Sequence, residues 1–232
     1  MNKIINYLKS VLNSIPGYSK VPLIMVLIYN FMVYFGSRIF TTSLYHHEIG
    51  SSLDQKIPLI PWTGLIYAFS YIFWVKNYIL AGKRDKEFAY RFCCGEMIMK
   101  TLCLFFYIFY PTTTIRPEIV GNGIWNHLMR FLYAIDPADN LFPSLHCSAS
   151  LFSVFAVYKN NEVPASYRYF SYLLTIMIFI STLTTRQHVI IDVFGSIAVA
   201  FTGYYLAKFP SILNIYRRMI EQIEKILNKT KL

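Results

Sequence analysis

The sequence contains few charged residues. Only 15% of its 232 residues are Asp, Glu, Lys or Arg, whereas 55% are hydrophobic. A soluble domain of this length needs a polar outer shell, and soluble proteins carry about 25% charged residues on average. The shortage of charge therefore excludes an ordinary water-soluble domain and favours a protein embedded in a membrane.

Cysteine is also scarce, and its spacing does not fit a metal site. The sequence has no CxxC pair, and no histidine stands at a zinc-ligand spacing from any cysteine. We interpret the cysteines as packing thiols within apolar segments. They are Cys93, Cys94, Cys103 and Cys147. The sequence predicts neither a metal site nor a cofactor.

The sequence is instead rich in long apolar runs. Six of them stand at about residues 22–44, 60–81, 92–110, 144–158, 169–184 and 188–208. A helix of about twenty residues crosses roughly 30 Å of hydrocarbon and satisfies its own backbone polar groups. The sequence therefore predicts an all-α, polytopic membrane bundle of about six transmembrane helices, in which residues 1–232 form a single integral membrane domain.

The positions of Lys and Arg predict the orientation of this bundle. If both termini and the 82–91 and 159–168 loops are cytoplasmic, fifteen of these residues lie on that side and five on the other. Because cytoplasmic loops retain positive charge during insertion, both termini are expected in the cytoplasm and the 111–143 loop outside it. The net charge of +10 then suits anionic lipid headgroups, and no nucleic-acid partner is expected.

The two ends of the chain have distinct patterns. Residues 1–21 lack the apolar stretch and cleavage site of a removable signal, so we expect a cytoplasmic lead-in. Residues 211–232 place Ile and Leu near helical spacing with Lys and Arg between them, which is typical of an amphipathic helix at a membrane surface. The expected location is the plasma membrane.

The segment DNLFPSLHCSAS, at the end of the 111–143 connection, predicts a phosphate site. Pro143 suits the first turn of a helix, Ser144 can direct its hydroxyl at an anion, and His146 lies in the first turn. The unpaired N–H groups at a helix start attract phosphate. The alternative is an ordinary helix start with an incidental histidine. Asp136 and Asp139 are interpreted as turn and capping residues, because more negative charge would repel an anionic substrate.

The segment TTRQHVIIDVFGS places His188 and Asp192 four residues apart, on one face of a helix. The carboxylate can bind the Nδ1 hydrogen and leave Nε2 as an oriented base or nucleophile. Ionisable groups inside an apolar segment are costly and mark function. Arg116 and Arg186 supply guanidinium groups that bind phosphate oxygens, although each could instead contact lipid headgroups.

Together these segments resemble the type 2 phosphatidic acid phosphatase superfamily, whose motifs are written KxxxxxxRP, PSGH and SRxxxxxHxxxD. The matching residues are Arg116-Pro117, Pro143-Ser144-Leu145-His146, and Ser181 with His188 and Asp192. The resemblance covers about a third of the chain, and the order of the motifs and the six-helix layout are also similar to that family.

The sequence departs from these motifs at three positions. Phe109 replaces the first-motif Lys, Thr182 the third-motif Arg, and Leu145 the Gly of the second motif. Arg186 follows Thr182 by four residues, one helical turn, and is expected to supply the lost charge from nearly the same face. These departures resemble the branch that includes inositol phosphorylceramide synthase and sphingomyelin synthase relatives.

The resemblance implies a metal-independent lipid phosphate phosphatase acting at the extracytoplasmic face. His188 would be the nucleophile that forms a phosphohistidine, Asp192 would orient it, and His146 would protonate the leaving alcohol. The phosphate oxygens would be held by Arg116, Ser144 and Arg186. Two alternatives stay open: a lipid phosphotransferase, and a non-catalytic protein that binds or moves phospholipid. The sequence predicts no oligomeric state.

Overall fold

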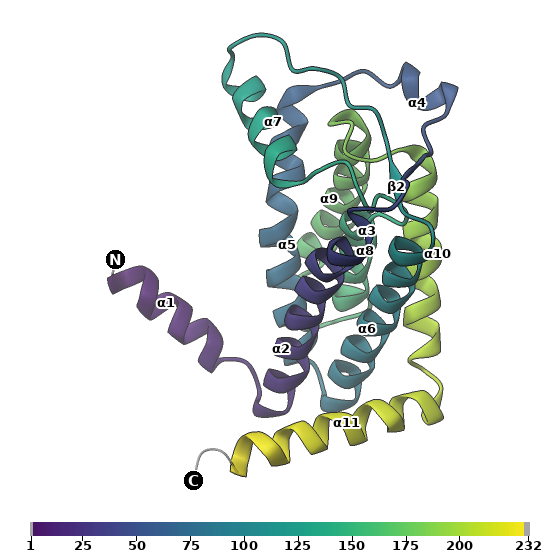
Figure 1. Ribbon diagram of the computed structural model, residues 1–232. Helices are drawn as coiled ribbons and strands as arrows, with labels where there is room; N and C mark the ends of the chain where they lie inside the picture. Colours follow the sequence, from purple (N-terminus) through teal and green to yellow (C-terminus); the bar gives the residue numbers. More distant parts are fainter. Residues whose placement is uncertain (1, 230–232) are drawn as a thin grey trace.

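The computed structural model describes residues 2–229 and is almost entirely helical (Figure 1). Its only strands in that range are β1 (His47–Glu48) and β2 (Thr112–Thr113), which pair in parallel, with His47 opposite Thr112. The all-α prediction is therefore confirmed. The short pair ties two connections that are far apart in the sequence.

The helical elements follow one another in chain order. They are α1 (Asn2–Asn13), α2 (Gly17–Phe31), the π-helical turn η1 (Met32–Gly36), α3 (Ser37–Thr41), α4 (Ser52–Lys56), the 3-10 turn η2 (Pro61–Thr63), α5 (Gly64–Lys83), α6 (Lys86–Phe109), α7 (Ile124–Ile135), α8 (Leu145–Val157), α9 (Ala165–Thr184), α10 (Ile190–Leu206) and α11 (Pro210–Lys229). Each of the six apolar runs in the sequence coincides with helical structure, because an apolar run can be buried only where its backbone groups are paired.

The long helices form one bundle in which α6 packs against α2 and α10, while α8 packs against α5, α9 and α10. By length and composition, Gly17–Thr41 and Lys86–Phe109 can each cross a membrane. A third candidate arises if α10 and α11, which are bent by 83° relative to each other, count as one span. Two or three candidate spans are thus present among residues 2–229, and six crossings stay a prediction.

Glycine permits a close contact between α6 and α10. A Cβ atom at Gly95 of α6 would lie 2.9 Å from the carbonyl oxygen of Gly203 in α10. A Cβ atom at Gly203 would lie 3.0 Å from the backbone nitrogen of Met99, and closer still to the carbonyl oxygen of Gly95. The two backbones therefore touch where neither residue has a side chain, which holds the C-terminal part of α10 against α6.

Helices and loops cover the two ends of the bundle differently (Figure 1). At one end α11 lies crosswise, with Leu213, Tyr216 and Ile220 buried against the bundle, so the amphipathic tail predicted for residues 211–232 is a helix as far as Lys229. Residues 230–232 of that tail, like residue 1 of the lead-in, lie outside the described residues. The opposite end carries α4, α7 and the paired strands.

The 111–143 connection is more ordered than the sequence indicated. It contains β2 and the twelve-residue helix α7, whose apolar residues Met129 and Leu132 are buried. The hydroxyl of Thr112 accepts hydrogen bonds from the backbone N–H groups of Leu141 and Phe142, at 3.1 and 2.9 Å. Because the end of the connection is fixed to β2, the residues just before α8 have defined positions.

Candidate functional site

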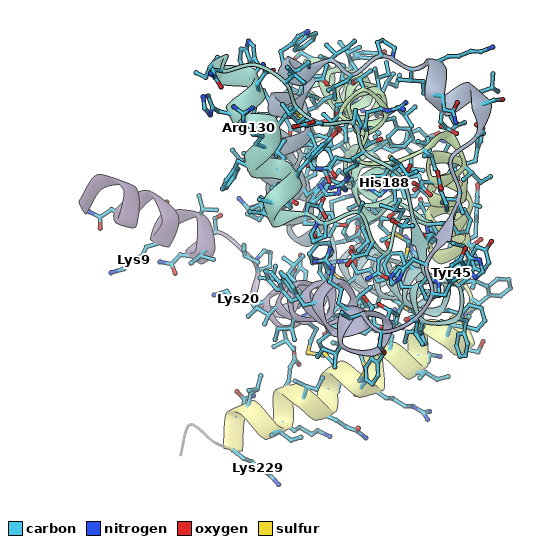
Figure 2. All side chains as sticks on the ribbon, turned by 45° about the horizontal axis from the view of Figure 1, so that its top comes forward. Lys9, Lys20, Tyr45, Arg130, His188 and Lys229 are labelled. Carbon is cyan, nitrogen blue, oxygen red and sulfur yellow. The ribbon has the colours of Figure 1, made fainter. Side chains whose placement is uncertain are left out.

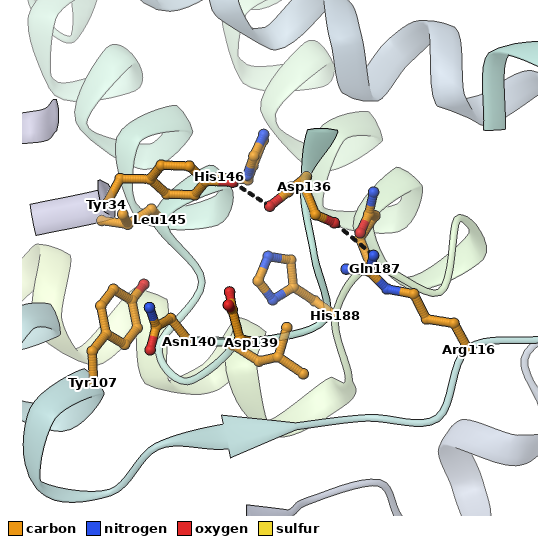
Figure 3. A pocket seen from close by; sticks show the side chains of 11 residues that line it. Tyr34, Tyr107, Arg116, Asp136, Asp139, Asn140, Leu145, His146, Gln187 and His188 are labelled. Atoms are coloured by element: carbon orange, nitrogen blue, oxygen red, sulfur yellow. Dashed lines mark hydrogen bonds between the residues drawn. The ribbon is translucent and has the colours of Figure 1, made fainter. Parts of the chain in front are cut away.

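A small cavity of about 20 Å³ lies inside the loop-bearing end of the bundle (Figure 3). Its polar lining comes from η1, the 111–143 connection, the start of α8 and the turn before α10. These polar residues are Tyr34, Arg116, Asp136, Asp139, Asn140, His146, Gln187 and His188, with Tyr107 of α6 beside them. In a view tilted so that the loop-bearing end comes forward, His188 lies within the body of the protein, whereas Lys9 and Lys229 lie on α1 and α11 (Figure 2).

His188 is held by the start of α10. The carboxylate of Asp192, in the first turn, accepts hydrogen bonds from the backbone N–H of Val189 at 3.0 Å and from Nδ1 of His188 at 3.1 Å. Asp192 is fully buried, and His188 is 9% exposed. Because Nδ1 is occupied by the carboxylate, Nε2 is the nitrogen that remains for chemistry.

His146 faces the same cavity from the start of α8. Its ring stacks on Tyr67 with 4.0 Å between ring centroids, and its centroid lies 6.2 Å from that of His188. Nε2 of His146 is buried and has no hydrogen-bond partner. The structure therefore brings together the two histidines that the sequence predicted, and each has a ring nitrogen left for a further contact.

Arg116 reaches the cavity from the connection before α7. Its Nη1 donates a 2.6 Å hydrogen bond to the backbone oxygen of Asp136, and its guanidinium lies 4.8 Å from the ring centroid of Tyr133. Burial lowers the pKa of Arg116, which nevertheless stays cationic because an arginine titrates far above neutral pH. Its Nε is buried without a partner, so one donor is free for an anion.

Ser144 and Arg186, the other predicted phosphate ligands, do not line this cavity. Ser144 is fully buried and caps α8 by accepting a 3.3 Å hydrogen bond from the backbone N–H of Cys147. Arg186 donates through Nη1 to the backbone oxygens of Asp54 and, at 3.2 Å, of Ile57. It lines a second cavity of about 190 Å³, and His188 lines both cavities.

Arg186 does not lie where its helical spacing predicted. Four residues after Thr182, it was expected one helical turn further along, on nearly the same face. Helix α9 instead ends at Thr184, and Arg186 has a left-handed backbone conformation with φ of 58°. Since the helix stops two residues earlier, helical spacing does not apply, and the side chain points into the neighbouring cavity.

Asp136 is a site residue that the sequence interpretation missed. It follows the last residue of α7, as expected of a capping position, but its carboxylate lines the cavity. The hydroxyl of Tyr34 donates to Oδ1 at 2.5 Å, and that of Tyr67 donates to Oδ2. Burial alone would raise the pKa of Asp136, but the ring of His146 and these two hydroxyls outweigh it, so the pKa lies below its usual value. Asp136 is therefore an anion at neutral pH.

Gln187 is the second residue that the sequence interpretation missed. It is fully buried, and neither its amide nitrogen nor its amide oxygen has a hydrogen-bond partner. Ten buried side-chain polar atoms lack partners in the described part of the chain, and five of them belong to residues that line this one cavity. These residues are Arg116, Asn140, His146 and Gln187. Because orphaned buried polar groups are costly, their concentration here indicates a site for a polar ligand.

Among the described residues, no group of three or more His, Cys, Asp or Glu side chains is arranged to hold a metal ion. The chain matches no known protein-family model, and no curated protein matches it. The assignment of a function therefore depends on the geometry of the site.

Proposed function

We propose that this protein is a metal-independent membrane enzyme that cleaves a lipid phosphate ester through a phosphohistidine. In its simplest form it is a lipid phosphate phosphatase, with water as the final acceptor. The observation that supports this most directly is the pair of imidazoles, 6.2 Å apart between centroids, with His188 bound through Nδ1 to a buried carboxylate. A protein that only binds phospholipid has no need of an oriented nucleophile next to a second imidazole.

The residues divide the reaction into two displacements. Nε2 of His188 attacks phosphorus while the imidazolium of His146 protonates the leaving alcohol. Water then attacks the phosphohistidine and gives its proton to His146, and the P–Nε2 bond breaks. Arg116 and the amide of Gln187 stabilise charge on the phosphate oxygens that do not take part in bond breaking.

A second candidate function is lipid phosphotransfer, in which an alcohol replaces water. The cavity of about 190 Å³ beside His188 favours it, because such a space can hold an acceptor next to the nucleophile. Adding a lipid alcohol to the reaction separates the two candidates, since transfer gives a new phospholipid and hydrolysis does not.

The proposed function is tested by incubating the purified protein in detergent and EDTA with a panel of lipid phosphates. We expect release of the phosphate or of the alcohol at a rate that EDTA leaves unchanged. A rate that disappears in EDTA and returns with magnesium would contradict the proposed mechanism, and so would no turnover of any lipid in the panel.

The proposed orientation places both termini in the cytoplasm, the cavity at the extracytoplasmic face and the protein in the plasma membrane, with a bundle of six crossings. We predict that Lys56→Cys, in α4 beside the site, reacts in intact cells with a maleimide that cannot cross membranes. Asn161→Cys, between α8 and α9, is expected to react only after lysis. Both positions are exposed, and the four native cysteines are buried. The reverse labelling pattern would invert the proposed topology.

Gln187→Leu is expected to change stability and activity in opposite directions. Removing two unpartnered buried atoms should leave the free energy of unfolding unchanged or raise it by about 1–3 kcal/mol. Lipid phosphate turnover should fall about a hundredfold, because a donor to the phosphate is lost. Thermal unfolding in detergent and turnover by the same preparation check this. A destabilised but fully active variant would assign Gln187 to packing alone.

A further inference from the structure

The two ring nitrogens of His146 have different surroundings. Nδ1 lies 3.1 Å from the hydroxyl oxygen of Tyr67, which comes from α5. Nε2 is buried, has no hydrogen-bond partner, and belongs to a ring that lines the same cavity as His188. Because a neutral imidazole carries one hydrogen, the contact with Tyr67 decides which nitrogen holds it and which keeps a lone pair.

The single hydrogen of the Tyr67 hydroxyl points away from His146. It is donated to Oδ2 of Asp136, a carboxylate that can only accept while it is an anion. Toward His146 the phenol oxygen therefore offers a lone pair, and Nδ1 must be the donor of that contact. The neutral ring then holds its hydrogen on Nδ1 and has a lone pair on Nε2.

Further contacts keep Asp136 anionic and in place. The hydroxyl of Tyr34 donates to Oδ1 at 2.5 Å (Figure 3), and Nη2 of Arg38 lies 3.7 Å from the same oxygen. The backbone oxygen of Asp136 accepts the hydrogen bond from Arg116. Hydrogen bonds to an ionised group are about twice as strong as neutral ones, so the hydroxyl of Tyr67 has a preferred acceptor in this carboxylate.

Aromatic rings fix the plane of the His146 ring. Tyr67 stacks on it with an angle of 23° between the ring planes, and the ring centroid of Trp74 lies 5.1 Å away. Nε1 of Trp74 donates a 2.8 Å hydrogen bond to the hydroxyl of Ser150, which holds the indole in place. The faces of Tyr and Trp rings also attract a cation, so these contacts suit the imidazolium as well as the neutral ring.

We propose that Asp136 and Tyr67 form a relay that keeps a hydrogen on Nδ1 of His146 and presents Nε2 to the substrate as the acid and then the base. This inference rests on the phosphohistidine chemistry of the proposed function and assigns two positioning residues to it. Tyr67 does not line the cavity and acts through His146.

The relay allows both displacements to proceed without a rearrangement of the ring. In the first, Nε2 of His188 bonds to phosphorus, the P–O bond breaks, and the hydrogen on Nε2 of His146 goes to the departing oxygen. In the second, water bonds to phosphorus and gives a proton back to Nε2 of His146 as the P–Nε2 bond of His188 breaks. The hydrogens on Nδ1 and on Tyr67 stay where they are. With the opposite tautomer, the lone pair would face Tyr67 and could not accept the proton of water.

The two histidines are oriented by different means. Nδ1 of His188 contacts a carboxylate directly, which suits a nucleophile that becomes cationic when it bonds to phosphorus. His146 has to release a proton in one step and accept one in the next. A neutral phenol between its ring and Asp136 fixes the tautomer but weakens the attraction for the cation, because that attraction falls with distance. The titratable groups that face His146 are Tyr67, Tyr71, Asp136 and His188.

Tyr67→Phe tests the relay, because it keeps the stacked ring and removes the hydroxyl. The full chain is assayed in detergent and EDTA at pH 7.5 with two esters. One is phosphatidate, whose leaving alcohol needs a proton, and the other is 4-nitrophenyl phosphate, whose phenol leaves as a stable anion. We expect kcat/KM to fall about a hundredfold for phosphatidate and less than about threefold for 4-nitrophenyl phosphate, since only the first reaction needs the acid.

Tyr78→Phe is the matched control. Tyr78 also belongs to α5 and also donates to a buried carboxylate, Oε1 of Glu96 at 2.7 Å, but it lies about three turns from Tyr67. Both variants lose one hydrogen bond between a tyrosine and a carboxylate, and thermal unfolding measures the cost of that loss in each. The ratio of kcat/KM for the two esters should stay at its wild-type value in Tyr78→Phe.

The tautomer of His146 is measurable without any turnover. Nitrogen-15 NMR of the protein labelled in its five histidines distinguishes a ring nitrogen that carries a hydrogen from one that does not, and His146→Gln identifies the signals of this ring. At pH 9, where an imidazole is ordinarily neutral, we expect the hydrogen on Nδ1 in the wild type. Tyr67→Phe should give a mixture of the two tautomers.

The outcomes separate this inference from the function on which it rests. A hydrogen on Nε2 of His146 in the wild type would overturn the relay and leave the role of His188 intact. Equal losses for the two esters in Tyr67→Phe would do the same. If no lipid gives a product that depends on His188, the proposed function fails and the catalytic role of the relay fails with it, while the NMR measurement still decides whether Tyr67 sets the tautomer.

Discussion

His188→Ala is expected to lower lipid phosphate turnover at least about a thousandfold, the largest effect of any single side chain in this protein. The substitution removes the nitrogen that we propose bonds to phosphorus, and no other residue that lines the cavity is placed to replace it as a nucleophile oriented by a buried carboxylate. The fold should persist, because a small polar cavity is enlarged and the capping contact of Asp192 with Val189 remains.

A covalent intermediate gives this prediction a direct readout. With a lipid labelled in its phosphate, the wild-type protein should retain label after an alkaline quench and lose it in acid, as expected of a phosphorus–nitrogen bond. His188→Ala should retain none. Label that persists in His188→Ala would assign the nucleophile to another residue.

Two further variants are compared with His188→Ala, one as a control and one as a test of the role of Asp192. His127→Ala, on the exposed face of α7, should match the wild-type rate. Asp192→Asn should lose about a hundredfold or more, because the ring of His188 is no longer held in the correct tautomer by a carboxylate. Full activity in Asp192→Asn would contradict the role of this pair.

Gly203→Leu is expected to have the largest effect on stability. The Cβ atom alone would enter space filled by the backbone of α6 at Gly95 and Met99, and a backbone cannot move aside as a side chain can. We expect a loss of about 3 kcal/mol or more in the free energy of unfolding, or a fall of about 10 °C in Tm for a chain of this size. Thermal unfolding followed by circular dichroism in detergent measures it.

Gly36→Ala is the matched control, since it also adds a side chain to a helical glycine. A Cβ atom at Gly36 would have no neighbour within 4 Å, so the change should be neutral or slightly stabilising. If the two substitutions lower the free energy of unfolding equally, the close α6–α10 contact does not explain the effect of Gly203→Leu.

The parts of the fold that could be predicted are the helices formed by long apolar runs of sequence. All six apolar runs became helices, because each run is long enough to require internal pairing of its backbone. Helix α7 was not predicted, because it lies in a segment that contains Pro117, Gly121 and Gly123, and such residues favour loops. The apolar spacing of Met129 and Leu132 was the signal that could have shown it.

The site was predictable where a residue sits in a local motif. His188 and Asp192 meet because they are four residues apart at a helix start, and His146 follows a recognisable cap. Asp136 and Gln187 could not be recognised in the same way, because their positions depend on Tyr34, on Tyr67 and on the end of α9, which are distant in the sequence or set by tertiary contacts.

The pairing of β1 with β2 bears on how the proposed enzyme would use its affinity for a substrate. The pairing, together with the two hydrogen bonds to the hydroxyl of Thr112, anchors the chain that carries Asp136 and Asp139. A segment already immobilised by folding loses little conformational entropy when a lipid docks. More of the attraction between protein and lipid is then available to lower the barrier to bond breaking rather than to organise the polypeptide.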